Sequence, residues 1–140
     1  MHVSECTIRV RYAETDQMGY VYYGNYAQYY EVARVEALRS IGLSYKMFED
    51  QGIMMPVLNL ACKYMKPAKY DDLLTIRTII KTKPGVRIQF DYEVYNEAGI
   101  LLNQGETTLV CINMETQRPC NAPAILMEKL GPFFEDTKSN

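Results

Sequence analysis

The sequence predicts an α+β domain in which one long helix lies against an antiparallel sheet. Three observations support this prediction. Apolar residues recur at helical spacing over 26–41, apolar and polar residues alternate over 86–95, and the later segments are joined mainly by short turns. Strands with short connections run antiparallel, and a helix and a sheet with one apolar face each must bury those faces together. We therefore expect residues 1–140 to form a single domain whose sheet curls around the helix.

A strand and the long helix account for most of the N-terminal third. Polar and apolar residues alternate over 6–12, which predicts a strand with one exposed face. The stretch TDQMG that follows has the composition of a turn. In the helix over 26–41, Asn25 is the expected N-cap, and Gly42 is expected to end the helix in a left-handed conformation.

The remainder of the chain predicts a short helix, four strands and a C-terminal helix. Ser44 is expected to cap a helix over 45–51 that Gly52 terminates. The four strands are expected over 54–65, 73–82, 86–95 and 101–113. The tetrapeptide at 96–99 predicts a hairpin connection. A last helix is expected over 124–134.

The composition argues against several classes of partner. With a formal net charge of -2, the chain offers no electrostatic case for nucleic acid or an anionic membrane as its main partner. The sequence has no run of 18 apolar residues, and its N-terminus lacks a charged start followed by an apolar core. We therefore expect no membrane span, no signal peptide and a cytoplasmic location.

Cysteine and histidine usage restricts the chemistry further. The four cysteines form no Cys-x-x-Cys pair and have no histidine nearby, which indicates free thiols rather than a zinc site. They are Cys6, Cys62, Cys111 and Cys120. His2 is the only histidine and lies at a terminus, so a mechanism with a histidine base is not expected. An enzyme built from this chain would use carboxylates, hydroxyls, thiols, lysines or backbone amides.

Asp16 is the candidate reactive group, and two interpretations of it are open. An Asp near a Gly in a turn commonly accepts hydrogen bonds from its own backbone. A catalytic interpretation comes from the residues downstream. Gly19 permits a tight bend, and the chain then reaches a helix start whose unpaired N–H groups can bind an oxyanion. Asp16 could serve there as nucleophile or as general base toward water. Such a site suffices for acyl transfer from a good leaving group, which a thioester has and an amide lacks.

The segment 11–42 resembles the opening of the 4-hydroxybenzoyl-CoA thioesterase-like hotdog family, in its acyl-CoA thioesterase branch. The shared motif is an Asp, a Gly three positions later, an apolar-aromatic step, a helix start and an Ala-Arg pair. In this chain these are Asp16, Gly19, Val21-Tyr22-Tyr23, Asn25 to Tyr29, and Ala33-Arg34. A second motif matches at Pro67, Ala68, Asp72 and Leu74. The likeness extends over residues 8–113, with both motifs in the family's order.

The resemblance implies a hotdog fold, in which a five-stranded antiparallel sheet wraps around one long helix. It also implies a homodimer or homotetramer with active sites at subunit interfaces, and no cofactor beyond the coenzyme A of the substrate. By the same resemblance, Asp16 is the catalytic carboxylate and the backbone N–H of Tyr23 polarises the thioester carbonyl. Gly19 is implied to permit the close approach of these groups.

Two positions depart from the family pattern. Close relatives often carry His where this chain has Tyr23, so either the Tyr23 hydroxyl takes over that role or only the backbone N–H contributes. Met18 stands where many relatives have a small residue, which would narrow or reshape the pocket. Further candidates for substrate binding are Tyr12 and Tyr22 near the acyl group, for which core or interface packing is the alternative role, and Lys63 and Lys66 near the coenzyme A phosphates.

We expect an enzyme that hydrolyses an acyl-CoA to a free acid and coenzyme A. Thioester hydrolysis on an acyl carrier protein is an alternative, and so is a hotdog protein that binds acyl-CoA without turnover. A hotdog dehydratase is disfavoured because it would need an active-site histidine. Glu14 and Glu31 could supply a second acid, although side chains of this kind are more commonly exposed to solvent.

Overall fold

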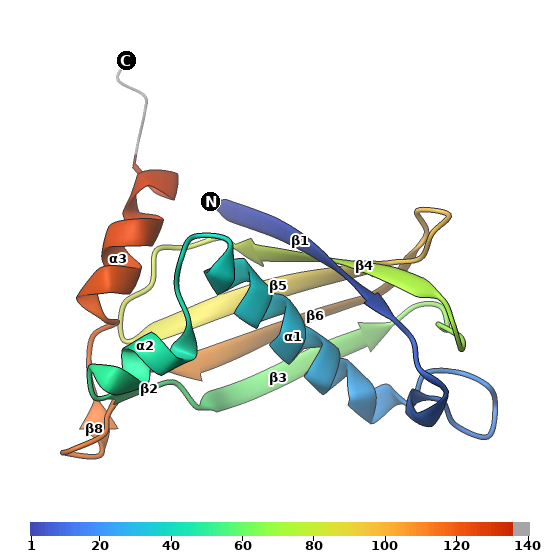
Figure 1. The fold of residues 1–140 in the computed structure, drawn as a ribbon, viewed down its shortest axis with the longest axis horizontal. Helices are drawn as coiled ribbons and strands as arrows, with labels where there is room; N and C mark the ends of the chain where they lie inside the picture. Colours follow the sequence, from blue (N-terminus) through green and yellow to red (C-terminus); the bar gives the residue numbers. More distant parts are fainter. Residues whose placement is uncertain (136–140) are drawn as a thin grey trace.

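A five-stranded antiparallel sheet and one long helix dominate the structure (Figure 1). The computed structural model describes residues 1–135. The sheet has the strand order β1-β4-β5-β6-β3, and helix α1 lies across one of its faces. These elements are β1 (His2–Arg9), α1 (Tyr26–Arg39), β3 (Val57–Tyr64), β4 (Leu73–Ile80), β5 (Arg87–Tyr95) and β6 (Leu101–Val110). The expected α+β class, with one helix against a five-stranded antiparallel sheet, is confirmed.

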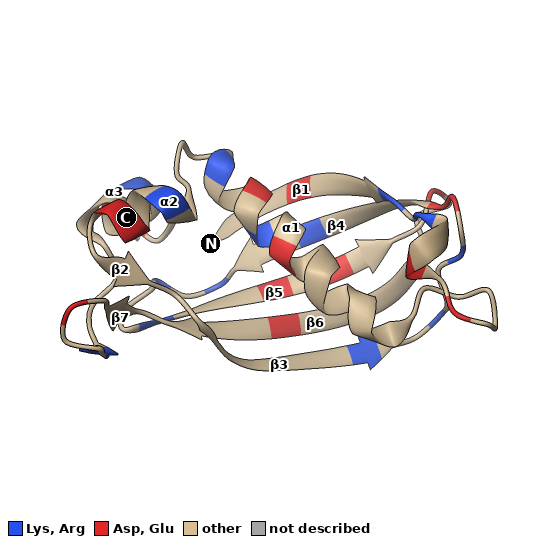
Figure 2. Ribbon diagram, turned by 60° about the horizontal axis from the view of Figure 1, so that its bottom comes forward, with Lys and Arg blue, Asp and Glu red and all other residues tan. Residues whose placement is uncertain are grey.

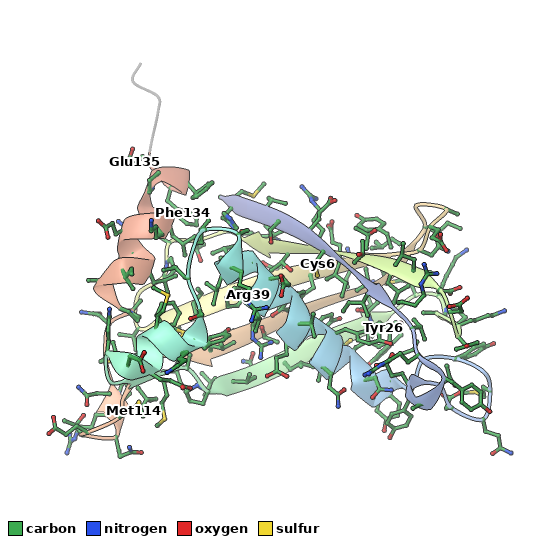
Figure 3. All side chains as sticks on the ribbon, viewed as in Figure 1. Cys6, Tyr26, Arg39, Met114, Phe134 and Glu135 are labelled. Carbon is green, nitrogen blue, oxygen red and sulfur yellow. The ribbon has the colours of Figure 1, made fainter. Side chains whose placement is uncertain are left out.

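Helix α1 packs on the sheet through a stripe of tyrosines, alanines and a leucine. Tyr30 is fully buried, and its ring stacks on that of Tyr92 in β5 with the ring centroids 4.2 Å apart. The other buried apolar positions of the stripe are Tyr26, Tyr29, Ala33, Ala37 and Leu38. Their spacing is the helical periodicity that predicted this element. Figure 3 places Tyr26 at the end of α1 that lies beside the loop leading from β1.

Both ends of α1 differ in detail from the prediction. The helix ends earlier than expected, at Arg39, and Gly42 then adopts the expected left-handed conformation with φ +82°. A single 3-10 turn, η2 (Tyr23–Asn25), precedes the helix. Asn25 has helical backbone angles and does not cap it; its side-chain Nδ2 instead donates to the carbonyl oxygen of Glu14 at 2.7 Å. An Asn side chain can donate as well as accept, and sequence alone does not distinguish the two roles.

Strand β1 lies nearer the N-terminus than predicted. It spans His2–Arg9 rather than 6–12, because its ladder with β4 begins at the His2–Ile80 pair and ends at Arg9–Leu73. Past that point β4 offers no further partner, and the chain turns into a 3-10 helix, η1 (Tyr12–Glu14). The alternation in the sequence does not reveal where a partner strand ends.

Two of the predicted strands are divided. The segment 54–65 is interrupted at Pro56, which lacks the N–H that a continuous ladder requires. The segment 101–113 is interrupted at Cys111, whose N–H donates to the carbonyl oxygen of Val86. The short pieces form a second sheet of order β2-β7-β8, with β2 at Ile53–Met54, β7 at Ile112–Asn113 and β8 at Arg118–Pro119.

The remaining helices match the predictions closely. Helix α2 (Tyr45–Asp50) is capped as expected, since Oγ of Ser44 accepts a hydrogen bond from the N–H of Met47 at 3.3 Å. The C-terminal helix forms as α3 (Ala124–Leu130), which continues as the 3-10 turn η3 (Gly131–Phe133). Across residues 1–135, no helix has the length and apolar character needed to cross a membrane. Figure 2 shows acidic and basic positions interspersed along α1 and the strands of the main sheet.

Candidate active site

The chain between β1 and α1 folds into a hairpin-like loop. Thr15 and Val21 form an isolated antiparallel bridge, and the N–H of Asp16 donates to the carbonyl oxygen of Tyr20 at 2.8 Å. At the tip, the N–H of Gly19 donates to the carbonyl oxygen of Asp16 at 2.9 Å. Gly19 has φ +81°, and a Cβ at this position would meet no atom within 4 Å, so the left-handed backbone accounts for the glycine. The loop returns the chain directly to η2.

The carboxylate of Asp16 makes local turn contacts through one oxygen and, within residues 1–135, leaves the other oxygen free. Its Oδ1 accepts hydrogen bonds from the N–H of Met18 at 2.9 Å and of Tyr20 at 3.2 Å, which is the local turn arrangement. Its Oδ2 accepts no hydrogen bond from residues 1–135. One oxygen therefore holds the carboxylate in place, while the other remains available to a water molecule or a substrate.

The start of the helical region presents backbone N–H groups that the fold does not use. The N–H of Tyr22 donates to the carbonyl oxygen of Glu14, and the N–H of Asn25 donates to that of Tyr22, both at 2.9 Å. Between them, the N–H groups of Tyr23 and Gly24 donate to no acceptor in the described part of the chain. Free N–H groups at the first turn of a helix carry a partial positive charge and can stabilise an oxyanion.

A pocket of about 270 Å³ brings the carboxylate and this helix start together. Its walls come from the loop, the first turn of α1, the end of β3 and the connection after β3. The lining residues are Asp16, Met18, Tyr20, Val21, Tyr23, Tyr26, Tyr64, Met65, Lys66 and Pro67. The pocket thus has an acid, aromatic and apolar walls and one ammonium group, which suits an uncharged acyl group attached to an anionic carrier.

Comparison with known proteins decides the family. Residues 18–102 match the family model described as the Thioesterase superfamily. YneP of Bacillus subtilis (strain 168) is 37% identical over 119 residues, which are 85% of this chain and 86% of YneP. The acyl-CoA thioester hydrolase YbgC of Escherichia coli O6:H1 is 33% identical over 116 residues, 83% of this chain and 87% of YbgC. The chain belongs to the thioesterase superfamily.

Solved structures of thioesterases share the fold of this superfamily member. The DHNA-CoA thioesterase of Staphylococcus aureus superposes with a TM-score of 0.89 at 36% sequence identity, covering 95% of this chain and 91% of that protein. A 4-hydroxybenzoyl-CoA thioesterase mutant, at 22% identity and a TM-score of 0.82, shares the fold. With the family model and the sequence relatives, these structures confirm the resemblance to the 4-hydroxybenzoyl-CoA thioesterase-like hotdog family.

The pocket of about 270 Å³ is lined by four of the residues that the sequence predicted for the site, namely Asp16, Met18, Tyr23 and Lys66. Gly19 shapes the loop beside it. Two nominated tyrosines lie outside the lining. Tyr12 is 77% exposed and packs edge-to-face on Tyr70, because β1 ends early and η1 turns the side chain outward. The ring of Tyr22 lies against that of Tyr23 with the centroids 4.7 Å apart.

Lys63 lies on the other face of the sheet from this pocket. It lines a separate groove of about 470 Å³ together with Asp91 and Glu106. Side chains alternate along a strand, so Tyr64 faces the pocket and the preceding lysine faces away. Lys66 lies in the pocket wall and Lys63 does not, and the phosphate-binding role of Lys63 stays a prediction.

Tyr64 is a site residue that the sequence analysis missed. Its hydroxyl donates to the carbonyl oxygen of Tyr23 at 3.2 Å, and its ring lies edge-to-face with that of Tyr26. Burial and neighbouring groups, including Cys62, raise the pKa of Tyr64, so its hydroxyl stays protonated and can donate. The alternation along β3 was the available signal, but it does not show which face meets the helix start.

The expectation that Glu14 is exposed to solvent is wrong, because this residue is only 8% exposed. Glu31 is exposed, as expected. Burying an ionised side chain is costly unless it is paired and hydrogen-bonded, so the surroundings of Glu14 must satisfy its charge.

In residues 1–135, no group of three or more His, Cys, Asp or Glu side chains is arranged to hold a metal ion.

Proposed function

We propose that this protein hydrolyses acyl-CoA thioesters to the free acid and coenzyme A. The observation that carries the proposal is one pocket lined both by Asp16, whose Oδ2 accepts no hydrogen bond from residues 1–135, and by Tyr23, whose N–H donates to no acceptor in those residues. The first is a nucleophile or general base and the second stabilises an oxyanion, and thioester hydrolysis requires both. Membership of the thioesterase superfamily supports the same reaction class.

In the proposed reaction, the thioester carbonyl oxygen accepts the N–H of Tyr23 and the acyl carbon faces Oδ2 of Asp16. Either Asp16 takes a proton from a water molecule that attacks the carbon, or its carboxylate attacks directly and water later cleaves the resulting anhydride. In both routes the carbon–sulfur bond breaks, and the thiolate of coenzyme A leaves and takes up a proton. No metal or other cofactor enters these steps.

The routes differ in the origin of the new carboxylate oxygen. A single turnover in oxygen-18-labelled water puts the label in the product acid if water attacks. Direct attack by Asp16, followed by attack of water on the Asp16 carbon of the anhydride, leaves the label on the enzyme's carboxylate and the product unlabelled after that first turnover. An unlabelled product acid together with a labelled Asp16, both measured by mass spectrometry, therefore identifies Asp16 as the nucleophile.

For substrate binding, we assign Met18 to the wall of the acyl pocket and Lys66 to the coenzyme A phosphates. Met18 is 71% exposed and flexible, so it can adapt to the acyl group without filling the cavity. An ammonium group at the pocket wall suits the anionic carrier. We further place the reaction in the cytoplasm, in keeping with the free cysteines.

We propose that two copies associate along the β3 edge of the sheet, as in a homodimer or a pair of such dimers. β3 is an edge strand and is exposed almost throughout. It carries Val57, Leu58 and Leu60, which are each 43–48% exposed. An exposed apolar edge strand is a template for pairing with a second copy. Because Tyr64 and the pocket wall belong to the same strand end, this association would place the active site at the interface.

The decisive experiment follows thiol release from a panel of aliphatic and aromatic acyl-CoAs. Asp16→Asn is expected to lower kcat by about 10²- to 10⁴-fold, because amide nitrogen and oxygen provide neither base nor nucleophile. Asp50→Asn, an exposed helix position paired with Lys46, is the matched control and should leave kcat unchanged. Full activity of Asp16→Asn would disprove the assigned chemistry.

Two further outcomes separate the alternatives. Turnover of acyl carrier protein thioesters without turnover of any acyl-CoA would replace the proposal with the carrier-protein reaction. Tight binding of acyl-CoA without turnover of either substrate would indicate a binding protein. Tyr23→Phe in the same assay is expected to keep its activity, because its backbone N–H, not its hydroxyl, contacts the substrate.

A further inference from the structure

Glu14 is a buried carboxylate whose two oxygens are both held by hydrogen bonds. Its Oε1 accepts from the N–H of Arg11 at 2.8 Å and from the hydroxyl of Tyr29 at 2.9 Å. Its Oε2 accepts from Nε and Nη2 of Arg11 at 3.0 and 2.8 Å. Burial alone would raise the pKa of Glu14, but these hydrogen bonds outweigh it and hold the pKa below its ordinary value. The group is therefore an anchored carboxylate at neutral pH.

The backbone of the same residue holds the start of the helical region. The carbonyl oxygen of Glu14 accepts the N–H of Tyr22 at 2.9 Å and Nδ2 of Asn25 at 2.7 Å. Its side chain reaches Tyr29 one turn further along α1. Glu14 thus ties η1 to Tyr22 and Asn25, which flank the unpaired N–H groups, and to Tyr29 of α1.

The contacts of Glu14 lie on both sides of the two groups that the proposed reaction needs, the Asp16 carboxylate and the Tyr23 N–H. Asp16 follows Glu14 by two residues, and the bridge between Thr15 and Val21 fixes the loop that connects Asp16 to Tyr23. The carbonyl of Tyr22, which shares its peptide group with the N–H of Tyr23, accepts the N–H of Asn25. Rotation of that peptide would redirect the Tyr23 N–H, and the contacts of Glu14 and Asn25 oppose such a rotation.

The charge of Glu14 is also compatible with this position. An unneutralised carboxylate near the helix start would disfavour the negative charge that develops on a thioester oxygen. The forked guanidinium of Arg11 neutralises it, and Arg11 itself is 77% exposed, so its desolvation costs little. Glu14 can therefore hold the loop without weakening the anion-binding N–H groups.

We propose that Glu14 is a positioning residue that sets Asp16 and the Tyr23 N–H at their reactive separation. This proposal rests on the thioester hydrolysis proposed above. Glu14 does not contact the substrate. Its loss relaxes the separation between the attacking group and the oxyanion donor, which affects the transition state more than the binding of substrate. The effect therefore falls on kcat and leaves KM largely unchanged.

The test compares Glu14→Gln with Glu36→Gln in the wild-type background. Glu36 is a matched control because it also pairs with an arginine three residues away, Arg39 at 2.6 Å, but on the exposed part of α1. Glu14→Gln is expected to lower kcat by about 10- to 100-fold with KM within about twofold, as small misplacements of reacting groups do. Glu36→Gln should match the wild type. If Glu14→Gln does not fold, Tyr29→Phe removes a single hydrogen bond and should lower kcat in the same direction.

Amide hydrogen exchange gives a second measurement that needs no turnover. Peptides covering residues 15–25 should exchange faster in Glu14→Gln than in the wild type, and Glu36→Gln should leave them unchanged. A lower melting temperature with unchanged kcat and unchanged exchange of this loop would show a purely structural role and overturn the inference. The two proposals fail separately: absent turnover in the wild type, or full activity of Asp16→Asn, refutes the reaction itself. Normal kcat in folded Glu14→Gln refutes only the positioning role.

Discussion

Tyr64→Phe tests whether the edge strand β3 helps to hold the turn η2, which carries the N–H that we propose binds the oxyanion. The change removes only the hydroxyl that donates to the carbonyl oxygen of Tyr23 at 3.2 Å and keeps the ring against Tyr26. That carbonyl belongs to the same peptide group as the free N–H of Gly24. A hydrogen bond accepted by the carbonyl fixes this peptide and strengthens the N–H as a donor. Its loss should therefore loosen the turn η2, which also carries the Tyr23 N–H proposed to bind the oxyanion, and so weaken stabilisation of the oxyanion.

The structure sets the size of this effect. A neutral hydrogen bond contributes about 0.5–1.5 kcal/mol, which corresponds to about a 2- to 13-fold change in rate. Three features favour the lower end: the 3.2 Å distance is long for a hydroxyl donor, Tyr64 is 51% exposed, and the same carbonyl also accepts the N–H of Tyr26. We therefore expect kcat to fall by about 2- to 4-fold with little change in KM.

The assay is steady-state thiol release from the best substrate of the panel. Tyr70→Phe is the matched control, because Tyr70 is also an exposed tyrosine in an edge-to-face pair but lies outside the pocket lining. Equal kcat values for Tyr64→Phe and the wild type, or an equal decrease in Tyr70→Phe, would refute the reasoning. A change confined to KM would mean that the hydroxyl contacts the substrate instead.

Two further predictions concern stability. Gly105→Ala should destabilise the fold by about 1–3 kcal/mol, because its Cβ would overlap the buried ring of Tyr30; calorimetric melting measures this, with Gly85→Ala as the open-space comparison. Equal melting temperatures for the two variants would contradict the overlap. The stability difference between the wild type and Glu14→Gln should narrow in acid. Burial would raise the pKa of Glu14, but its hydrogen bonds to Arg11 hold this pKa below the ordinary 4.5 in the folded protein. The charged carboxylate therefore stabilises the fold fully above about pH 4.5, and this stabilisation is lost as the pH falls through the lower folded-state pKa. Urea unfolding at several pH values measures this difference, and a constant difference down to roughly pH 3 would refute it.

Local patterns predicted most of the secondary structure because local forces set it. The helical stripe through Tyr30 and the alternation through Tyr92 each identified a buried face, and the two rings stack on each other in the core. The errors fall at element ends. β1 ends at Arg9, and the strand predicted over 54–65 is divided at Pro56 into β2 and β3. The length of a strand depends on its ladder partner and on the hydrogen bonds that each residue can make.

Candidate site residues could be nominated from the sequence where their geometry is local. The turn at Asp16 is formed by hydrogen bonds within five residues, so its sequence contains the necessary information. Tyr64 and Glu14 were missed for the opposite reason. The contact of Tyr64 with Tyr23 joins residues 41 positions apart, and the burial of Glu14 depends on Tyr29 of the packed helix.

The sequence by itself determined a helix with one apolar stripe, a sheet with one apolar face, and a turn that presents Asp16 shortly before a helix start. It also limited the reactive groups, because His2 is the only histidine. The tertiary structure decided which face of β3 meets that helix start, and so placed Tyr64 in the pocket and Lys63 on the opposite face. It also decided that Glu14 is buried and bonded. The physical reason is that periodicity shows which side chains share a face, whereas the register of β3 on β6 and the packing of α1 determine what that face contacts.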